Sequence, residues 1–197
     1  SRELSEARLA ALKKQLEPHF LFNALNTVSA FVREDPVRAE AMIGHLSAFL
    51  RETLRQGDAP EVPLGKELEL LGSWLEVMKA RFEDRLDVAV EAPPETLRVL
   101  VPHLVLQPLV ENAVRHGAGL GTLRVTVSAA RAGARLRLVV ADSGPGLRTS
   151  PGEALESGTG LSNTARRLHA LHGDDQRLEL ANGLSGGLVV TVEVPWL

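Results

Sequence analysis

The sequence predicts an α+β protein in two parts, a helical hairpin followed by a sandwich of helices and antiparallel strands. Apolar residues recur at helical spacing through most of the first 58 residues. After residue 100, alternating apolar runs that are typical of strands are interleaved with helical segments. Because helices and strand hairpins follow one another in this order, we expect helices to cover one face of an antiparallel sheet.

Composition narrows the functional classes. The 197 residues carry a net charge of -3, with 44% hydrophobic and 24% charged residues, which gives no electrostatic case for nucleic acid or an anionic membrane. The absence of cysteine excludes disulfides, zinc–thiolate sites and thiol catalysis. No apolar run approaches the ~20 residues of a membrane span. A helical pattern begins directly at Ser1, so we interpret the sequence as a piece of a longer protein.

The first half reads as two helices joined by a tight turn. The apolar spacing predicts a helix over residues 3–33 and a second helix from Pro36 to about residue 54. Asp35 can cap the second helix, and Pro36 suits its first turn. The apolar face is wider than one hairpin can cover, so pairing two copies into a four-helix bundle would bury it.

Residues 56–63 contain Gly57, Pro60 and Pro63 and are predicted to be a linker. The remaining predicted elements follow in order: a helix over 64–82, a strand over 86–90, a helix within 100–116 that begins after Pro102, strands around 123–129 and 136–140 joined at 131–134, a loop over 144–158, a helix over 159–172 that Gly173 ends, and a hairpin of 177–181 with 188–194.

The common phosphate-binding motifs are absent. In the P-loop pattern Gly65-Lys66 would have to be followed by Ser or Thr, but position 67 is Glu and the first glycine is replaced by Pro60. Gly158-Thr159-Gly160 lacks the third glycine of the dinucleotide fingerprint, because position 163 is Asn.

Another arrangement of residues fits a nucleotide. Asp142 ends a predicted strand and can accept a hydrogen bond from an exocyclic amine such as that of adenine. Gly144 and Gly146 allow close approach of the backbone to a ligand and movement of the following loop. Gly158 and Gly160 precede a helix N-terminus, where free N–H groups favour phosphate.

The helix within 100–116 supplies the polar groups. Asn112 offers an amide oxygen to a hard cation such as Mg²⁺. Arg115 and His116 lie three and four residues later, hence on the same helical face, where Arg115 can contact phosphate. Each piece taken alone also has a purely structural reading, as a turn, a helix entry or a solvated face. Their order and spacing together favour the nucleotide site.

His19 is the candidate nucleophile. It stands on a strongly apolar helical pattern directly after Pro18. A neutral imidazole, with a pKa of about 6.5, has a free lone pair at pH 7 that can attack a γ-phosphorus. Asn23, four residues later on the same face, can orient the ring or the phosphoryl group. The alternative is a structural histidine beside a helix kink, yet a mid-helix proline costs about 3 kcal/mol and a purely structural helix has no need of one.

These motifs together resemble the GHKL superfamily of gyrase, chaperone ATPases, histidine kinases and mismatch-repair proteins. Asn112, Asp142-x-Gly144-x-Gly146 and Gly158-x-Gly160-Leu161 look like its N, G1 and G2 boxes. Two longer segments closely resemble the LytS-type sensor histidine kinases: Leu16–Asn26 and Leu106–Gly117.

The resemblance implies a helical dimerisation and phosphotransfer domain over residues 1–63 and an ATP-binding α/β sandwich of the GHKL (Bergerat) type over 64–197. It implies Mg²⁺ on Asn112, adenine on Asp142, and a mobile lid at the glycines. The implied function is autophosphorylation of His19 with Mg-ATP by a homodimer, and transfer to an aspartate of a response regulator. The implied location is the cytoplasm. If the whole protein is a membrane-bound sensor, this chain would be its cytoplasmic portion.

Two departures from related patterns bear on mechanism. Hydrolytic members of the superfamily carry a glutamate four residues before the Mg²⁺-binding Asn, where this chain has Pro108, which cannot be a base. This argues against a hydrolytic ATPase. The intact N, G1 and G2 boxes argue against a degenerate, non-catalytic nucleotide-binding scaffold. Phe20 follows His19 where histidine kinases commonly carry an acid, which leaves Glu17, or no side chain, as the base. Glu111 is a further catalytic candidate, as metal ligand, base or support for the metal ligand.

Overall fold

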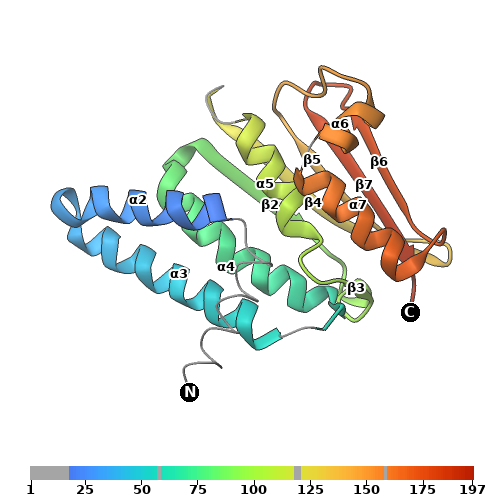
Figure 1. Ribbon diagram of the computed structural model, residues 1–197, viewed down its shortest axis with the longest axis horizontal. Helices are drawn as coiled ribbons and strands as arrows, with labels where there is room; N and C mark the ends of the chain where they lie inside the picture. The colour runs from blue at the N-terminus through green and yellow to red at the C-terminus, as the bar shows by residue number, and fades with distance from the viewer. Residues whose placement is uncertain (1–17, 57–58, 118–120, 158) are drawn as a thin grey trace. The chain divides into compact units, whose positions relative to one another are not determined.

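The computed structural model describes residues 18–56, 59–117, 121–157 and 159–197 (Figure 1). Contacts divide the chain into two compact units, Ser1–Asp58 with Leu70–Glu83, and Ala59–Glu69 with Asp84–Leu197. The predicted boundary at residue 64 stays a prediction. Among the described residues, no helix combines the length and the apolar character that crossing a membrane requires.

The first unit is helical. It contains α2 (Pro18–Glu34), α3 (Pro36–Gln56) and most of α4 (Leu64–Phe82). Its core holds an aromatic cluster in which the ring of Phe20 lies 5.5 Å from that of Phe49 and 5.9 Å from that of Trp74. All three side chains are buried. The predicted helices over 36–54 and 64–82 are confirmed, and the first predicted helix is confirmed from residue 18 onward, since residues 3–17 lie outside the described ranges.

The turn between α2 and α3 forms as the sequence predicts. The Oδ1 atom of Asp35 accepts a hydrogen bond from the backbone N–H of Arg38 at 3.0 Å, which is the N-cap interaction expected before a helix that begins with Pro36. The Arg38 guanidinium lies 4.2 Å from the ring centroid of Phe31 and donates to the Ala80 carbonyl at 2.6 Å. These contacts hold α3 against α2 and α4.

The second unit is built on a five-stranded sheet in the order β2-β4-β5-β7-β6. Its strands are β2 (Leu86–Glu91), β4 (Leu123–Ala132), β5 (Arg135–Asp142), β6 (Arg177–Asn182) and β7 (Leu188–Pro195). The pairs β4–β5, β5–β7 and β6–β7 are antiparallel, as predicted, but β2 pairs with β4 in parallel. The expectation of a wholly antiparallel sheet was wrong here, because the chain passes through α5 (Leu106–Gly117) between these strands, and such a crossover makes neighbours parallel.

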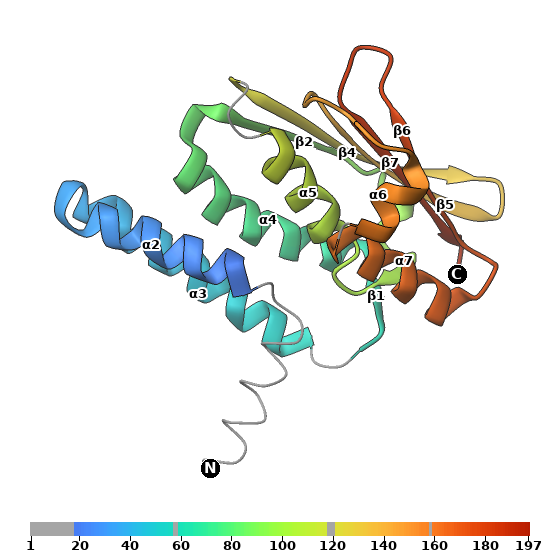
Figure 2. The same ribbon diagram turned by 45° about the horizontal axis from the view of Figure 1, so that its top comes forward.

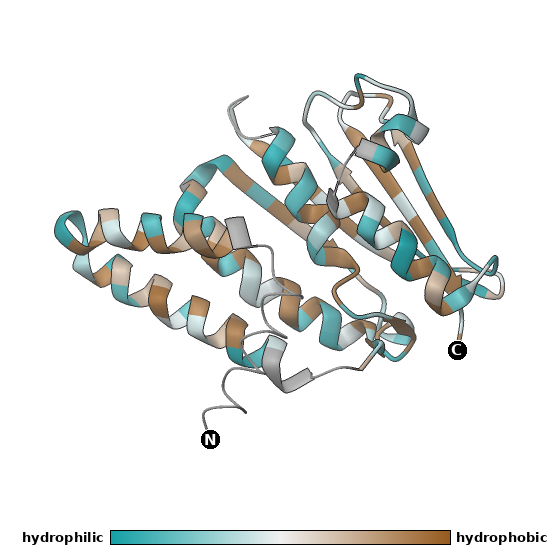
Figure 3. Cartoon of the chain, viewed as in Figure 1, coloured by the Kyte–Doolittle hydropathy of each residue, from teal (hydrophilic) through white to brown (hydrophobic). Residues whose placement is uncertain are grey.

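Helices cover one face of this sheet, as predicted. Helix α5 packs on β4 and β5, and α7 (Thr159–His172) packs beside α5 (Figure 2). Alternate strand residues turn toward these helices, so that apolar and polar residues alternate along the strands (Figure 3). The apolar residues that alternate along the two predicted strands over 123–129 and 136–140 are all buried: Leu123, Val125, Val127, Ala129, Leu136, Leu138 and Val140.

Three further differences from the sequence prediction concern single elements. The predicted linker ends in β1 (Glu61–Pro63), which pairs antiparallel with β3 (Leu100–Pro102), and α5 begins only at residue 106. The predicted loop over 144–158 contains α6 (Pro151–Ser157). Ser150 and Glu153 form a capping box there: the Glu153 carboxylate accepts from the Ser150 N–H at 2.9 Å, and the Glu153 N–H donates to the Ser150 hydroxyl at 3.3 Å. Short 3₁₀ turns occupy Glu83–Arg85 and Pro94–Thr96.

Candidate functional site

A cavity of about 600 Å³ opens in the second unit, at the end of β5. This volume lies within the range of small-molecule sites. Residues from α5, β5, the segment after β5, α6, α7 and β7 line it: Asn112, Arg115, His116, Asp142, Pro145, Gly146, Leu147, Arg148, Thr149, Ala154, Leu161 and Leu188. The wall therefore combines one carboxylate, one carboxamide, two guanidinium groups and several apolar side chains.

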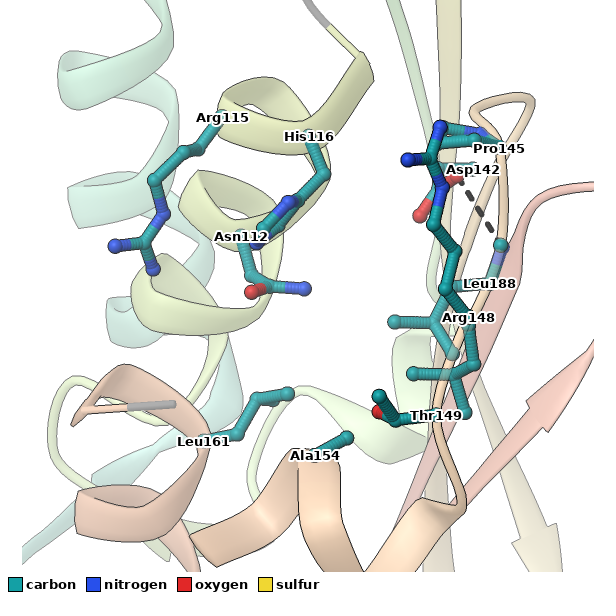
Figure 4. Close-up of a pocket in the computed structure, with 12 residues that line it drawn as sticks. Asn112, Arg115, His116, Asp142, Pro145, Arg148, Thr149, Ala154, Leu161 and Leu188 are labelled. Carbon is teal, nitrogen blue, oxygen red and sulfur yellow. Dashed lines mark hydrogen bonds between the residues drawn. The ribbon is translucent and has the colours of Figure 1, made fainter. Parts of the chain in front are cut away.

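Helix α5 forms one wall of this cavity. Asn112, Arg115 and His116 all line it, so the helical spacing placed them on a shared face as predicted. Figure 4 shows the Asn112 amide extending from α5 into the cavity, and the residue is only 7% exposed. A buried carboxamide directed into a polar cavity offers an oxygen ligand to a hard cation.

Asp142 forms the opposite wall, where β5 ends. Its Oδ1 atom accepts hydrogen bonds from the backbone N–H groups of Gly144 at 2.7 Å and Leu188 at 3.2 Å. These two bonds fix the carboxylate, and Figure 4 shows its other oxygen directed toward the α5 side of the cavity. That oxygen is oriented to accept a hydrogen bond from a ligand amine.

Two glycines allow the backbone to pack around Asp142. Gly146 has φ +73°, and a Cβ atom there would lie 2.6 Å from the Asn182 Oδ1 atom. Gly187 has φ +78°, and a Cβ atom there would overlap the Asp142 carbonyl oxygen. Both positions therefore require glycine. The first was singled out from the sequence; the second was missed, because only the folded β7 entry brings it against β5.

Asn182 was also missed. Its Oδ1 atom accepts from the Leu147 N–H at 2.6 Å, and its Nδ2 atom donates to the Leu147 carbonyl at 3.3 Å. This pair of bonds holds the segment that places Arg148 and Thr149 at the cavity (Figure 4). In the sequence Asn182 stands before a glycine and was interpreted only as part of a hairpin.

The N-terminal end of α7 approaches the same cavity. Leu161 lines it and is 4% exposed. A Cβ atom at Gly160 would lie 4.0 Å from a guanidinium nitrogen of Arg115 and 3.8 Å from the Cβ of Pro108. A helix N-terminus and an arginine thus converge, and both favour anions.

The predicted site residues fall into three groups. Those that line the cavity are Asn112, Arg115, His116, Asp142, Gly146 and Leu161. Glu111, Gly144 and Gly160 are not among the described residues that line it, although Gly144 bonds to Asp142. Gly158 lies outside the described residues. His19 and Asn23 lie one helical turn apart on α2, in the helical unit.

Family models match both parts of the chain. Residues 7–86 match the model described as histidine kinase, and residues 98–197, about half of the chain, match the histidine kinase-, DNA gyrase B-, and HSP90-like ATPase model. The chain belongs to the histidine kinase family. This confirms the resemblance stated from the sequence, and the ATPase model makes the second unit an ATP-binding one.

Curated relatives agree with this family. The chain is 37% identical over 195 residues to the sensor histidine kinase BtsS of Escherichia coli, a match that covers 98% of this chain and 34% of that protein. It is 32% identical over 199 residues to the sensor protein LytS of Oceanobacillus iheyensis, covering 94% of this chain and 34% of that protein. The chain thus spans about a third of the length of these relatives.

Solved structures share the fold. The catalytic domain of histidine kinase ThkA superposes with a TM-score of 0.58 at 22% identity, covering 69% of this chain and 95% of that chain. The histidine kinase domain of the Erythrobacter litoralis EL346 blue-light activated histidine kinase gives a TM-score of 0.58 at 18% identity, covering 100% of this chain and 95% of that chain. The predicted fold class, N-terminal helices followed by a GHKL-type sheet domain, is therefore confirmed.

Proposed function

We propose that this chain is the kinase portion of a sensor protein and transfers the γ-phosphoryl group of ATP to His19. The observation that carries the proposal is the cavity with Asn112 and Asp142 on facing walls, in a segment that matches the ATPase model. The same chain carries His19 on a helix within the segment matched by the histidine kinase model. We propose residues 1–63 as the phosphotransfer and dimerisation domain and 64–197 as the catalytic domain.

Within the cavity, Asp142 accepts a hydrogen bond from the adenine amine, because its fixed carboxylate presents one oxygen to the ligand. Arg115 and His116 face the triphosphate, and the α7 N-terminus that begins near Gly160 adds free N–H groups. Leu161 supplies apolar contact. Gly144, Gly146 and Gly158 belong to the segment that closes over the nucleotide.

The residues present fit a magnesium ion. Asn112 would hold it through its amide oxygen, which lies in the cavity on a nearly buried side chain. When bound, the ion neutralises charge on the phosphate oxygens. Glu111, the preceding residue, is proposed to support this position or to act as a base.

The acceptor is a ring nitrogen of neutral His19. A nitrogen–phosphorus bond forms as the bond from the γ-phosphorus to its bridging oxygen breaks, and ADP leaves with the electron pair. Asn23 lies one turn along α2 and orients the ring or the phosphoryl group. Phosphate then passes to an aspartate of a response regulator.

Exposed apolar side chains on α2 and α3 support a homodimer. Phe22 is 66% exposed, a large apolar area to leave in water. Similar residues lie along both helices: Leu25, Val32, Val37 and Ile43. We propose that a second copy covers them in a four-helix bundle. We also propose that the chain is the cytoplasmic portion of a membrane-bound sensor, as its curated relatives are sensors of greater length.

The test is labelling of the chain with γ-labelled Mg-ATP. We expect acid-labile, alkali-stable label in the wild type and none in His19→Gln or Asn112→Ala. ATP turnover without such label would instead indicate a hydrolytic ATPase, and binding with neither activity would indicate a nucleotide-binding scaffold. Mixing His19→Ala with Asn112→Ala chains restores label only if transfer occurs between protomers.

A further inference from the structure

Glu67 is a buried carboxylate to which the proposed phosphotransfer assigns no role. It lies near the start of α4 and is 1% exposed. Its Oε2 atom accepts from the Leu104 N–H at 3.0 Å, and its Oε1 atom accepts from the Leu106 N–H at 3.1 Å. Leu106 is the first residue of α5, so the second of these bonds satisfies an N–H group at a helix end that has no partner within the helix.

The backbone between these two bonds is strained. Leu104 has φ 57°, and among the described residues it is the sole non-glycine with a positive φ. A bulky residue occupies this left-handed region only when its surroundings hold it there. The bidentate carboxylate of Glu67 fixes both the strained residue and the helix start two residues later.

Helix α7 is joined to the same turn. The Arg167 guanidinium donates a hydrogen bond to the His103 carbonyl oxygen, next to Leu104. Burial lowers the pKa of Arg167, and the nearby negative charge of Glu67 opposes that shift. The Glu67 carboxylate lies 3.7 Å from a ring nitrogen of His103. It also interacts electrostatically with Arg167 of α7.

A second link joins α7 to β1, which directly precedes the helix that carries Glu67. Nε2 of His172, at the end of α7, lies 3.4 Å from the Glu61 carboxylate on β1. The segment over residues 61–67 therefore contacts the start of α5 through Glu67 and helix α7 through Glu61 and His172. These two helices carry most of the helical residues that line the cavity.

We propose that Glu67 is a positioning residue for the nucleotide site, and that it acts by setting where α5 begins and so where Asn112 lies. Asn112 is six residues beyond Leu106, about 9 Å along the helix axis. A shift of the helix start is carried along a rigid helix to that amide. This inference rests on the proposed nucleotide function of the cavity.

The Glu67→Gln variant tests the positioning role of Glu67, because glutamine has nearly the same side-chain volume as glutamate. A carboxamide has one oxygen, so it can accept from one of the two N–H groups while its NH₂ faces the other. Glu69→Gln is the matched control, because Glu69 lies on the same helix with a side chain 60% exposed and a surface ion pair to Lys66.

The measurement is the Kd for Mg-ADP, taken well below the melting temperature of each variant and corrected for the folded fraction. We expect Kd to rise about tenfold in Glu67→Gln and to stay within twofold of wild type in Glu69→Gln. In an Asn112→Ala background, Glu67→Gln should change Kd less than twofold, because its effect passes through Asn112. If Glu67→Gln does not fold, Glu67→Asp, which keeps the charge but is one methylene shorter, is measured in the same way.

A Kd in Glu67→Gln within twofold of wild type would overturn the inference. An equal fold-change with and without Asn112 would also overturn it, since Glu67 would then stabilise the fold without positioning Asn112. Both results leave the proposed function standing, because the wild type binds nucleotide. No binding by the wild-type chain would overturn both.

Discussion

Asp142→Asn changes the chemistry of one wall of the cavity and leaves its backbone contacts intact. In the wild type, Oδ1 accepts from Gly144 at 2.7 Å and from Leu188 at 3.2 Å. The amide oxygen of Asn can accept the same two bonds, so we expect the free energy of unfolding to fall by no more than about 1 kcal/mol. The group directed at the ligand changes from an acceptor to an NH₂ donor.

The adenine amine then meets a donor where it had an acceptor. A hydrogen bond to a charged group contributes about 1.5–3 kcal/mol, which corresponds to roughly 10- to 150-fold in affinity. We expect the Kd for Mg-ADP to rise within that range. Inosine diphosphate has a carbonyl in place of the amine, so the wild type should prefer ADP and Asp142→Asn should lose that preference.

Calorimetric titration with both nucleotides, together with a thermal melt, measures these quantities. Asp87→Asn is the control, because Asp87 is an exposed carboxylate on β2 that forms an exposed ion pair with Arg124 at 3.4 Å. That variant should bind both nucleotides as the wild type does. An Asp142→Asn chain that kept both its ADP affinity and its preference over inosine diphosphate would refute the role of Asp142 in adenine binding.

Three further predictions concern the supports of the fold. Asp35→Ala should lower the free energy of unfolding by about 1 kcal/mol in a denaturant titration, because α3 loses its N-cap, with nucleotide affinity unchanged. Asn182→Ala should weaken Mg-ADP binding several-fold in the same titration, since the Leu147 segment loses both of its hydrogen bonds; unchanged affinity would show that the segment needs no anchor. Hydrogen bonds from the N–H and hydroxyl of Ser150 lower the pKa of Glu153 below its ordinary value of 4.5, so they stabilise α6 above that pH, and this stabilisation is lost as the pH falls through the lowered pKa. Amide exchange over residues 151–157 should rise there; Glu153→Gln should abolish the pH step, whereas Ser150→Ala, which keeps the N–H donor, should only reduce it.

Local signals predicted much of the candidate site. The spacing of Asn112, Arg115 and His116 on one helix put them on one face of the cavity. Gly173 ends α7 in a left-handed conformation, φ 55°, as the sequence predicted. The Ser150 capping box was equally local and was missed, because the glycine-rich loop around it was interpreted as irregular throughout.

Local sequence signals could not predict the contacts between segments that are far apart in the chain. Asn182 reaches Leu147 across 35 residues, and nothing near Asn182 in the sequence distinguishes it from an ordinary turn residue. Arg148 and Thr149 line the cavity because that bond fixes the segment before them. A side chain whose role is to anchor a distant segment leaves no local pattern in the sequence from which that role could be predicted.

The sequence by itself determined most of the helices and strands, the apolar faces of β4 and β5, and the boxes that mark an ATP-binding kinase, because periodicity, capping and turn chemistry act over a few residues. The tertiary structure decided the β1–β3 pair, the parallel placement of β2 beside β4, and the use of Glu67 at the start of α5, 39 residues away. Those features depend on which segments meet in space, and the free energy that selects them comes from burial and hydrogen bonds that exist only once the chain has closed on itself.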